Sequence, residues 1–181
     1  MKKIGILLIA AVISGCASSY ELSSSAKQTL ASLNTKTAEK NIETLSRRSK
    51  QAGGLCLAGS VHTGPNTVPV IDNGKLQFTA SYEETTGYST AYTGSGYAVT
   101  RHYTLRKGAF AIKLLELKSI RIISGNNIPA CQYDGSGKIV VISDNAGMEG
   151  MINVTDANLD LLIASLHFLS PDANLKQGIG L

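Results

Sequence analysis

The chain has 181 residues, with 17 Lys and Arg against 13 Asp and Glu, three cysteines and no tryptophan. Two of the lysines, Lys2 and Lys3, lie at the N-terminus before an expected cleavage site, and without them the basic count falls from 17 to 15 and the formal charge from +4 to +2. A near-neutral body with 17% charged residues excludes the basic surface of a nucleic-acid-binding protein.

The first 15 residues have the order of a secretory signal peptide. Lys2 and Lys3 precede an apolar run over residues 4–13, and the run ends at the small residues Ser14 and Gly15. The run is too short to remain as a membrane-spanning helix, which needs about 20 apolar residues. We therefore expect residues 1–15 to be a signal peptide.

The residues Ile13-Ser14-Gly15-Cys16 resemble the lipobox of bacterial lipoprotein precursors. The resemblance implies that Cys16 receives a diacylglycerol, becomes the first residue after cleavage and anchors the chain through lipid alone. No aspartate follows the cysteine directly, which by the same resemblance implies the outer membrane, with the protein facing the periplasm. The alternative is a secreted protein that is cleaved elsewhere and carries no lipid on Cys16.

The next segment predicts a tether and a helix. Residues 16–24 are expected to form a short lipidated tether. Residues 25–52 contain no proline or glycine, begin with a capping-box pattern and end with cations before two glycines, so they predict one long helix. Its apolar stripe is thin, which favours a helical spacer, or a helix lying against one surface, over a core helix.

From residue 53 the hydrophobic period becomes twofold. Asn73-Gly74 predicts the turn of a hairpin, and residues 110–123 slip in phase twice, which predicts a bent strand or two strands meeting at a corner. The expected strands cover residues 67–71, 75–82, 97–105, 110–123, 138–143 and 148–154.

A second helix is predicted after Thr155 and Asp156, with an apolar face and a stop at Ser170-Pro171. The fold class is therefore α+β: an N-terminal helix, then a bent antiparallel sheet of about six strands closed by a C-terminal amphipathic helix, with residues 53–181 as the globular domain. The element order over residues 55–170 resembles pleckstrin-homology-like domains. That resemblance implies a fold and no ligand.

Cys56 and Cys131 are predicted to form a disulfide, because the periplasm is oxidising. Such a bond closes a long loop and would stabilise the fold by roughly 4 kcal/mol in the chain-entropy model. The alternative is a pair of buried free thiols. Neither cysteine belongs to a redox motif, so no catalytic thiol is expected.

No catalytic group, metal site or cofactor is predicted. His62, His102 and His167 lack the spacing of metal ligands. Glu83 and Glu84 are adjacent acids, but neighbouring strand residues point to opposite faces, which disfavours a cooperating pair.

The segment from residue 82 to residue 103 contains five tyrosines among Ser, Thr and Gly, which is the composition of an adaptable recognition surface. Its candidate binding residues are Tyr88, Tyr92, Tyr97, Arg101 and His102, and the partner would be an envelope protein or a glycan. The alternative is a mobile hairpin whose tyrosines cover the edge of the core.

These patterns favour a non-enzymatic, lipid-anchored interaction or structural module of the cell envelope. One alternative is an envelope hydrolase whose residues are distant in sequence, with Glu83 or Glu84 acting together with His102. A third hypothesis is membrane or peptidoglycan contact by the basic helix end, through Arg47, Arg48 and Lys50.

Overall fold

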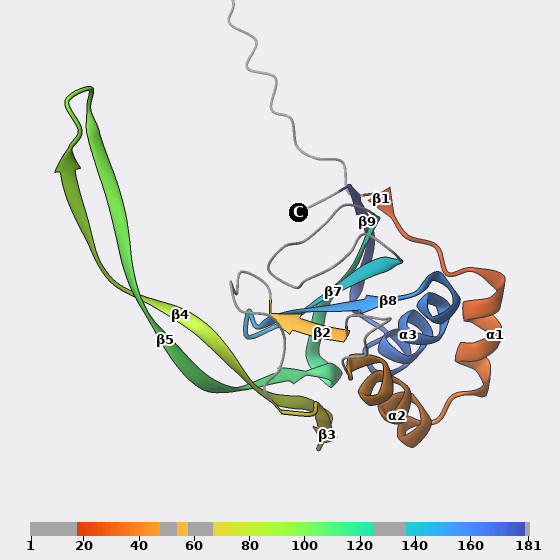
Figure 1. Ribbon diagram of the computed structural model, residues 1–181. Coiled ribbons are helices and arrows are strands. Elements are labelled where there is room, and N and C mark those ends of the chain that lie inside the picture. Colours follow the sequence, from red (N-terminus) through yellow and green to blue (C-terminus); the bar gives the residue numbers. More distant parts are fainter. Residues whose placement is uncertain (1–17, 48–53, 58–66, 125–136, 180–181) are drawn as a thin grey trace, which may run out of the picture.

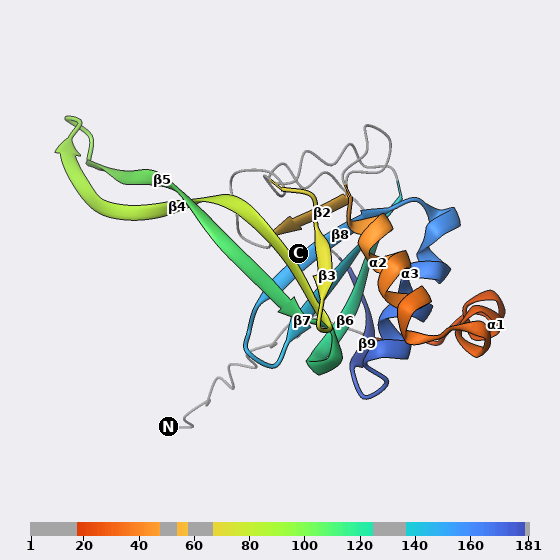
Figure 2. The same ribbon diagram turned by 90° about the horizontal axis from the view of Figure 1, so that it is seen from below.

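A six-stranded sheet carries three helices on one face, and a long two-stranded arm projects from a second, three-stranded sheet (Figure 1). The structure is a computed structural model that describes residues 18–47, 54–57, 67–124 and 137–179. The arm and the helices lie at opposite ends of the molecule in two perpendicular views (Figures 1 and 2). The helical face and the arm are therefore separate surfaces.

The six-stranded sheet is mixed and open, with the strand order β1-β9-β6-β7-β8-β2. The prediction of a purely antiparallel sheet is wrong, because β9 runs parallel to β6. The chain returns through a helix after β8 and then adds β9 beside β6, so a strand, not a helix, is the last element described. The strands are β1 (Ser18–Ser19), β2 (Gly54–Leu57), β6 (Leu117–Ser124), β7 (Lys138–Asp144), β8 (Glu149–Val154) and β9 (Asn174–Ile179).

The three-stranded sheet contains β3 (Val70–Asp72), β4 (Lys75–Tyr92) and β5 (Tyr97–Lys113). The hairpin predicted at Asn73-Gly74 is confirmed: both residues have positive φ, 50° and 69°, as a tight type I′ turn requires. The expected corner is confirmed as well. A 3-10 turn, η1 (Leu114–Glu116), separates β5 from β6, and a register shift follows at Leu117/Ser119.

The single helix predicted over residues 25–52 is wrong, since the structure has two helices, α1 (Ser24–Ser32) and α2 (Thr35–Ser46). The break lies at Asn34, whose side-chain Oδ1 accepts a hydrogen bond from the Thr37 amide at 2.9 Å and caps α2. Ala38 and Ile42 on α2 are fully buried, so this segment packs on the body and is not a free spacer. The expected tether also contacts the body, because β1 pairs with β9.

The predicted amphipathic helix is confirmed as α3 (Asp156–Leu169), with Thr155 at its N-cap. It packs against α1, α2, β8 and η1, and α2 lies beside it with contacts of its own to β2, β3 and β8. Asn41 on α2 donates a hydrogen bond to Ser165 on α3 at 3.1 Å. The larger buried cluster joins α2, α3, one face of the six-stranded sheet and the base of the arm.

Cys56 lies in a smaller buried cluster with Ile123, Ile139, Val141 and Met151, on the other face of the six-stranded sheet. Cys16 and Cys131 both lie outside the described residues, so no cysteine pair falls within them. The Cys56–Cys131 pairing therefore stays a prediction.

The two sheets meet at the base of the arm. Ile112 on β5 is fully buried and reaches over Gly150 on β8, where an added Cβ would come within 2.6 Å of the Ile112 Cδ1 atom. Asp144 at the end of β7 accepts a hydrogen bond from the Lys113 amide on β5 at 3.1 Å. The base of the arm is thus packed on the body and hydrogen-bonded to it.

Candidate interaction surface

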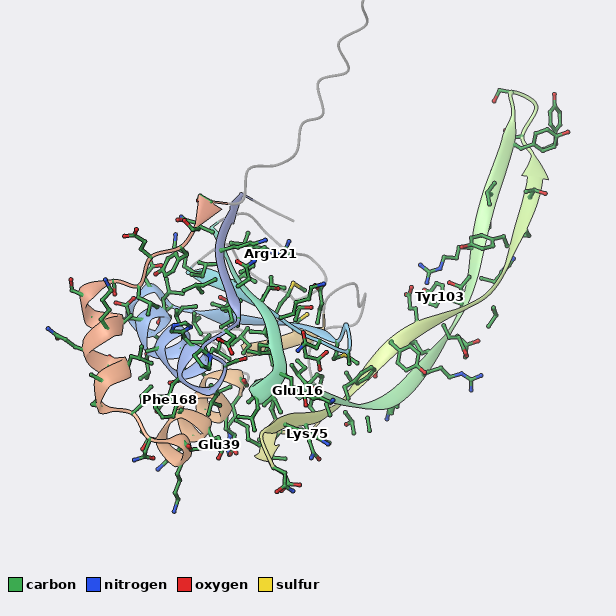
Figure 3. The ribbon with its side chains drawn as sticks, turned by 180° about the vertical axis from the view of Figure 1, so that it is seen from behind. Glu39, Lys75, Tyr103, Glu116, Arg121 and Phe168 are labelled. Atoms are coloured by element: carbon green, nitrogen blue, oxygen red, sulfur yellow. The ribbon has the colours of Figure 1, made fainter. Side chains whose placement is uncertain are left out.

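The arm is an antiparallel ribbon formed by β4 and β5. Pairing runs from Lys75↔Lys113 at the base to Tyr92↔Tyr97 at the tip. The outer part of this ribbon leaves the body and contributes no residue to the buried clusters beyond Ala80 on β4 (Figure 1). Figure 3 shows Tyr103 out on the arm and Lys75 at its base. Both faces of the outer arm are therefore available for contact.

The large apolar side chains of the outer arm lie on a single face. On β5, alternation places Tyr97, Val99, Tyr103 and Leu105 together. On β4 a register shift between Thr85 and Gly87 changes the phase, so that Tyr88 pairs with Arg101 and Tyr92 pairs with Tyr97 on the same face. We call this surface the tyrosine face; it comprises Tyr88, Tyr92, Tyr97, Val99, Arg101, Tyr103 and Leu105.

The apolar side chains of the tyrosine face are between 52% and 78% exposed. The rings of Tyr92 and Tyr97 form an edge-to-face pair at 5.4 Å, which concentrates aromatic surface at the tip. The fifth tyrosine of the segment, Tyr82, lies on the opposite face and packs its ring against Phe110 near the base. Four of the five tyrosines are therefore presented for contact, and one belongs to the arm's own packing.

One ion pair interrupts the tyrosine face. The Arg101 guanidinium lies 3.4 Å from the Glu83 carboxylate, donates a hydrogen bond to Thr85 and lies over the ring of Tyr103 at 5.9 Å. From residue 85 to residue 100 the sequence contains no charged residue. The outer arm is therefore uncharged beyond this pair, and recognition by it rests on shape and apolar area.

The opposite face of the outer arm is small and polar. Its side chains are Ser89, Ala91, Ala98, Thr100 and His102. The His102 Nε2 atom lies 2.8 Å from the Ser89 hydroxyl, so this histidine is separated from the four other candidate binding residues, which share the tyrosine face.

Of the acids considered for hydrolysis, Glu83 lies on the tyrosine face, and Glu84 lies on the same face as His102, where its carboxylate contacts Arg106. Glu83 and Glu84 lie on opposite faces, as predicted. Glu84 accepts a hydrogen bond from Arg106 at 2.8 Å. This hydrogen bond raises the pKa of the Arg106 guanidinium, and the negative charge of Glu84 raises it further. The one serine in contact with His102 is exposed on the ribbon, where no wall excludes water.

A shallow pocket of about 400 Å³ lies at the base of the arm, beside the stacked rings of Phe78 and Phe110. The Thr79 amide donates a hydrogen bond to the Thr67 hydroxyl at 2.9 Å, which ties the chain before β3 to the edge of β4. The pocket is lined by Thr67, Val68, Val70, Gln77, Phe78, Thr79, Ala109, Phe110 and Ala111. Sequence reasoning missed it, because it forms between a loop and a strand edge.

The other predicted sites are only partly placed. Cys16, Arg48 and Lys50 lie outside the described residues, and Arg47 forms an ion pair with Glu43 on the same helix. Across the part of the chain that the structure describes, no group of His, Cys, Asp or Glu side chains is arranged to hold a metal ion. None of the described helices is long and apolar enough to cross a membrane.

No family model matches the chain, and neither the curated proteins nor the solved structures contain a significant match.

Proposed function

We propose that this protein is a lipid-anchored, non-enzymatic interaction module of the bacterial envelope. Lipid on Cys16 would supply the location, at the outer membrane facing the periplasm, and the body would carry the arm. The single observation that supports this role is the tyrosine face, which gathers six exposed apolar side chains on one side of a projecting ribbon.

The exposed area favours a contact surface over an incidental one. At the observed exposures the four tyrosines leave roughly 500 Å² open, taking about 200 Å² for each aromatic side chain. The largest apolar patch on a typical soluble monomer is about 300–600 Å², and such patches are often functional. Val99 and Leu105 extend the tyrosine face beyond its aromatic part.

Binding a partner would also stabilise the arm itself. A two-stranded ribbon alone in water is at best marginally stable. Among the strands that the structure describes, β5 has no partner on its outer edge, and residues 97–100 carry none of the charges or prolines that usually protect such an edge. Contact with a partner would cover the apolar face and order the ribbon.

Replacing both tip tyrosines by serine should abolish most partner capture. In Tyr92→Ser with Tyr97→Ser, the edge-to-face pair that supplies the most exposed aromatic area is lost, and we expect at least about tenfold less protein captured from envelope extracts. The matched control is Ala91→Ser with Ala98→Ser, a neighbouring cross-strand pair on the opposite face. Equal capture by the two variants would show that the tyrosine face is not the binding surface.

The anchor has its own test. Cys16→Ser should abolish incorporation of radioactive fatty acid in cells, because the thiol is the proposed site of acylation. Cys56→Ser should keep the label, since that residue is not part of the lipobox. A native protein that takes up no fatty acid and begins at another residue would overturn the lipid anchor and the location with it.

The second candidate is an envelope hydrolase. The contact between the His102 Nε2 atom and the Ser89 hydroxyl favours it, because a serine beside a histidine is the start of a nucleophilic site. Its exposure on a ribbon counts against it, since such chemistry uses a cleft that excludes water. Covalent labelling of Ser89 by a serine-directed phosphonate would support this candidate.

A further inference from the structure

Beyond Leu105 the alternation on β5 carries the tyrosine face through Lys107, which pairs with Ser81, to Ala109 and Ala111 at the base of the arm. On β5, Ala109 and Ala111 follow in the same alternation, and on β4 they pair with Thr79 and Gln77. All four residues line the base pocket. The same face thus presents large aromatic side chains at the tip and, beyond Lys107, a hollow at the base. These four residues line the hollow together with Thr67, Val68, Val70, Phe78 and Phe110.

We propose that two copies of this chain pair arm to arm, antiparallel, with their tyrosine faces together. The proposal rests on the proposed function of the arm and names its partner as a second copy of the chain. The tip of each arm, with Tyr92 and Tyr97, fills the base pocket of the other copy. The two-fold axis passes through the Thr85–Tyr103 pair of each arm.

The register of β5 makes this arrangement self-complementary. Tyr103 lies six residues after Tyr97 and six residues before Ala109. When two arms cross antiparallel at Tyr103, the tip tyrosine of one copy therefore falls on the small base residue of the other. An isologous contact of this kind closes as a dimer and leaves no free end for further growth.

The Glu83–Arg101 pair matches under the same symmetry, whereas Lys107, four residues after Tyr103, falls opposite Val99, four residues before it. Arg101 lies two residues before Tyr103 on β5, and Leu105, which pairs with Glu83, lies two residues after it. The two-fold axis therefore brings Arg101 of each copy opposite Leu105 of the other copy, one strand away from the Glu83 of that copy. The Glu83–Arg101 pair within each arm becomes part of a four-membered network of alternating sign.

The area is sufficient for a stable dimer. With Val99 and Leu105 included, the open apolar area of one tyrosine face is about 700 Å², close to the roughly 800 Å² that each partner buries in a standard protein interface. A bilayer fits this face less well, because the Glu83–Arg101 pair lies partway along it and would have to enter the lipid.

Charge reversal separates this dimer from a purely internal ion pair. Arg101→Glu alone places a second carboxylate against Glu83 of the other copy, and Glu83→Arg alone places a second guanidinium against Arg101 of the other copy. Each variant of the full chain, purified in excess detergent, should lose self-association by at least about tenfold in sedimentation velocity and in co-purification of two differently tagged copies. Thr100→Glu, on the opposite face, should associate as the wild type does.

Mixing the two charge variants is the decisive step. In the mixed dimer the carboxylate introduced at position 101 of one copy meets the guanidinium introduced at position 83 of the other. The native Arg101 and Glu83 meet in the same way, so association should rise at least about fivefold above that of either variant alone. It should stay below the wild type, because each variant keeps a like-charged pair within its own arm. An ion pair that acts only within one arm is broken in both variants and would not recover on mixing. Wild-type chain that sediments as a monomer, or variants that do not recover on mixing, would overturn the dimer.

The same preparations distinguish this failure from failure of the proposed function. If the chain is a monomer but Tyr92→Ser with Tyr97→Ser still abolishes capture of another envelope protein, the arm remains an interaction element and only the second copy is wrong. If the wild-type chain instead binds vesicles of neutral phospholipid or isolated peptidoglycan through the tyrosine face, the dimer is likewise wrong.

Discussion

Consider a chain whose arm is shortened while the pairing between the remaining residues of β4 and β5 is kept. Its body should stay folded, and its capture of partners should fall to the background. The change removes residues 84–92 and 97–104, joining Glu83 to Thr93 and Gly96 to Leu105. None of the removed residues is buried. We therefore expect the free energy of unfolding to change by less than about 1 kcal/mol, as for other exposed segments away from the core.

The pairing of β4 and β5 explains why this cut is tolerated. Tyr92 and Tyr97 close the native four-residue loop, where the Thr93 amide donates a hydrogen bond to the Gly96 carbonyl at 2.8 Å. Leu105 is eight residues beyond Tyr97 on a strand without a register shift, so the Glu83–Leu105 pair is of the same type and has the same face. The loop should therefore close the shortened ribbon as it closes the native one.

Circular dichroism during urea unfolding measures the body, and capture from envelope extracts measures the arm. The loop length and the turn residues stay native. A shortened chain whose free energy of unfolding falls by several kcal/mol would therefore show that the outer arm stabilises the body. A shortened chain that is stable and still captures the same proteins would show that the interface lies elsewhere on the body.

The parts of the fold that sequence predicted are those with a strong local signal. Asn73-Gly74 adopts the positive φ angles that its turn needs, and the two phase slips after residue 113 mark η1 and a register shift in β6. The face of α3 was readable from helical spacing alone. Each of these signals is set by neighbours within a few residues, so tertiary context did not override it.

The errors arose where local propensity was neutral. Leu33 and Asn34 fit a helix interior almost as well as a break, and the capping bond of Asn34 decides between them. β9 is short and polar, and it pairs with β6 only because the chain returns there after α3. Parallel pairing of this kind depends on the path of the whole chain, which no local pattern contains.

Only some residues of the tyrosine face could be predicted from the sequence. Composition identified Tyr88, Tyr92 and Tyr97. Residues 97–105 were predicted as one strand, and its alternation places Val99, Tyr103 and Leu105 on a single face. The missing step was the register shift between Thr85 and Gly87, which brings the β4 tyrosines onto that face. A single extra residue in one strand leaves no signature in composition. His102 follows Arg101 directly on β5, so alternation alone places it on the opposite face from the other candidate residues.

Asp144→Ala should cost about 3–5 kcal/mol of unfolding free energy, a large part of the roughly 5–15 kcal/mol that holds a typical domain. Asp144 is only 1% exposed. One carboxylate oxygen accepts hydrogen bonds from the amides of Ala146 and Met148 at 2.9 and 3.0 Å, and the other accepts from the amide of Lys113 at 3.1 Å. Alanine would leave all three amide donors without this acceptor.

Asp144→Asn is the matched control, because the amide keeps one oxygen for Ala146 and Met148 but turns an NH₂ group toward the Lys113 amide. We expect it to lose about 1–2 kcal/mol, the share of one buried donor left unpaired. Asp172→Ala, at an exposed site with no such contacts, should change the free energy by less than about 0.5 kcal/mol. Equal losses for Ala and Asn would contradict the division of roles between the two oxygens.

The Lys113 bond gives Asp144 a second, separable effect, because it joins the base of the arm to the six-stranded sheet. Asp144→Asn should therefore increase amide hydrogen exchange at residues 112–114 more than in the centre of β7, while leaving the exposed arm unchanged. Partner capture should fall only in proportion to the folded fraction, since the tyrosine face lies far along the arm. A capture loss that exceeds the unfolded fraction would instead show that the angle of the arm, and not only its surface, determines binding.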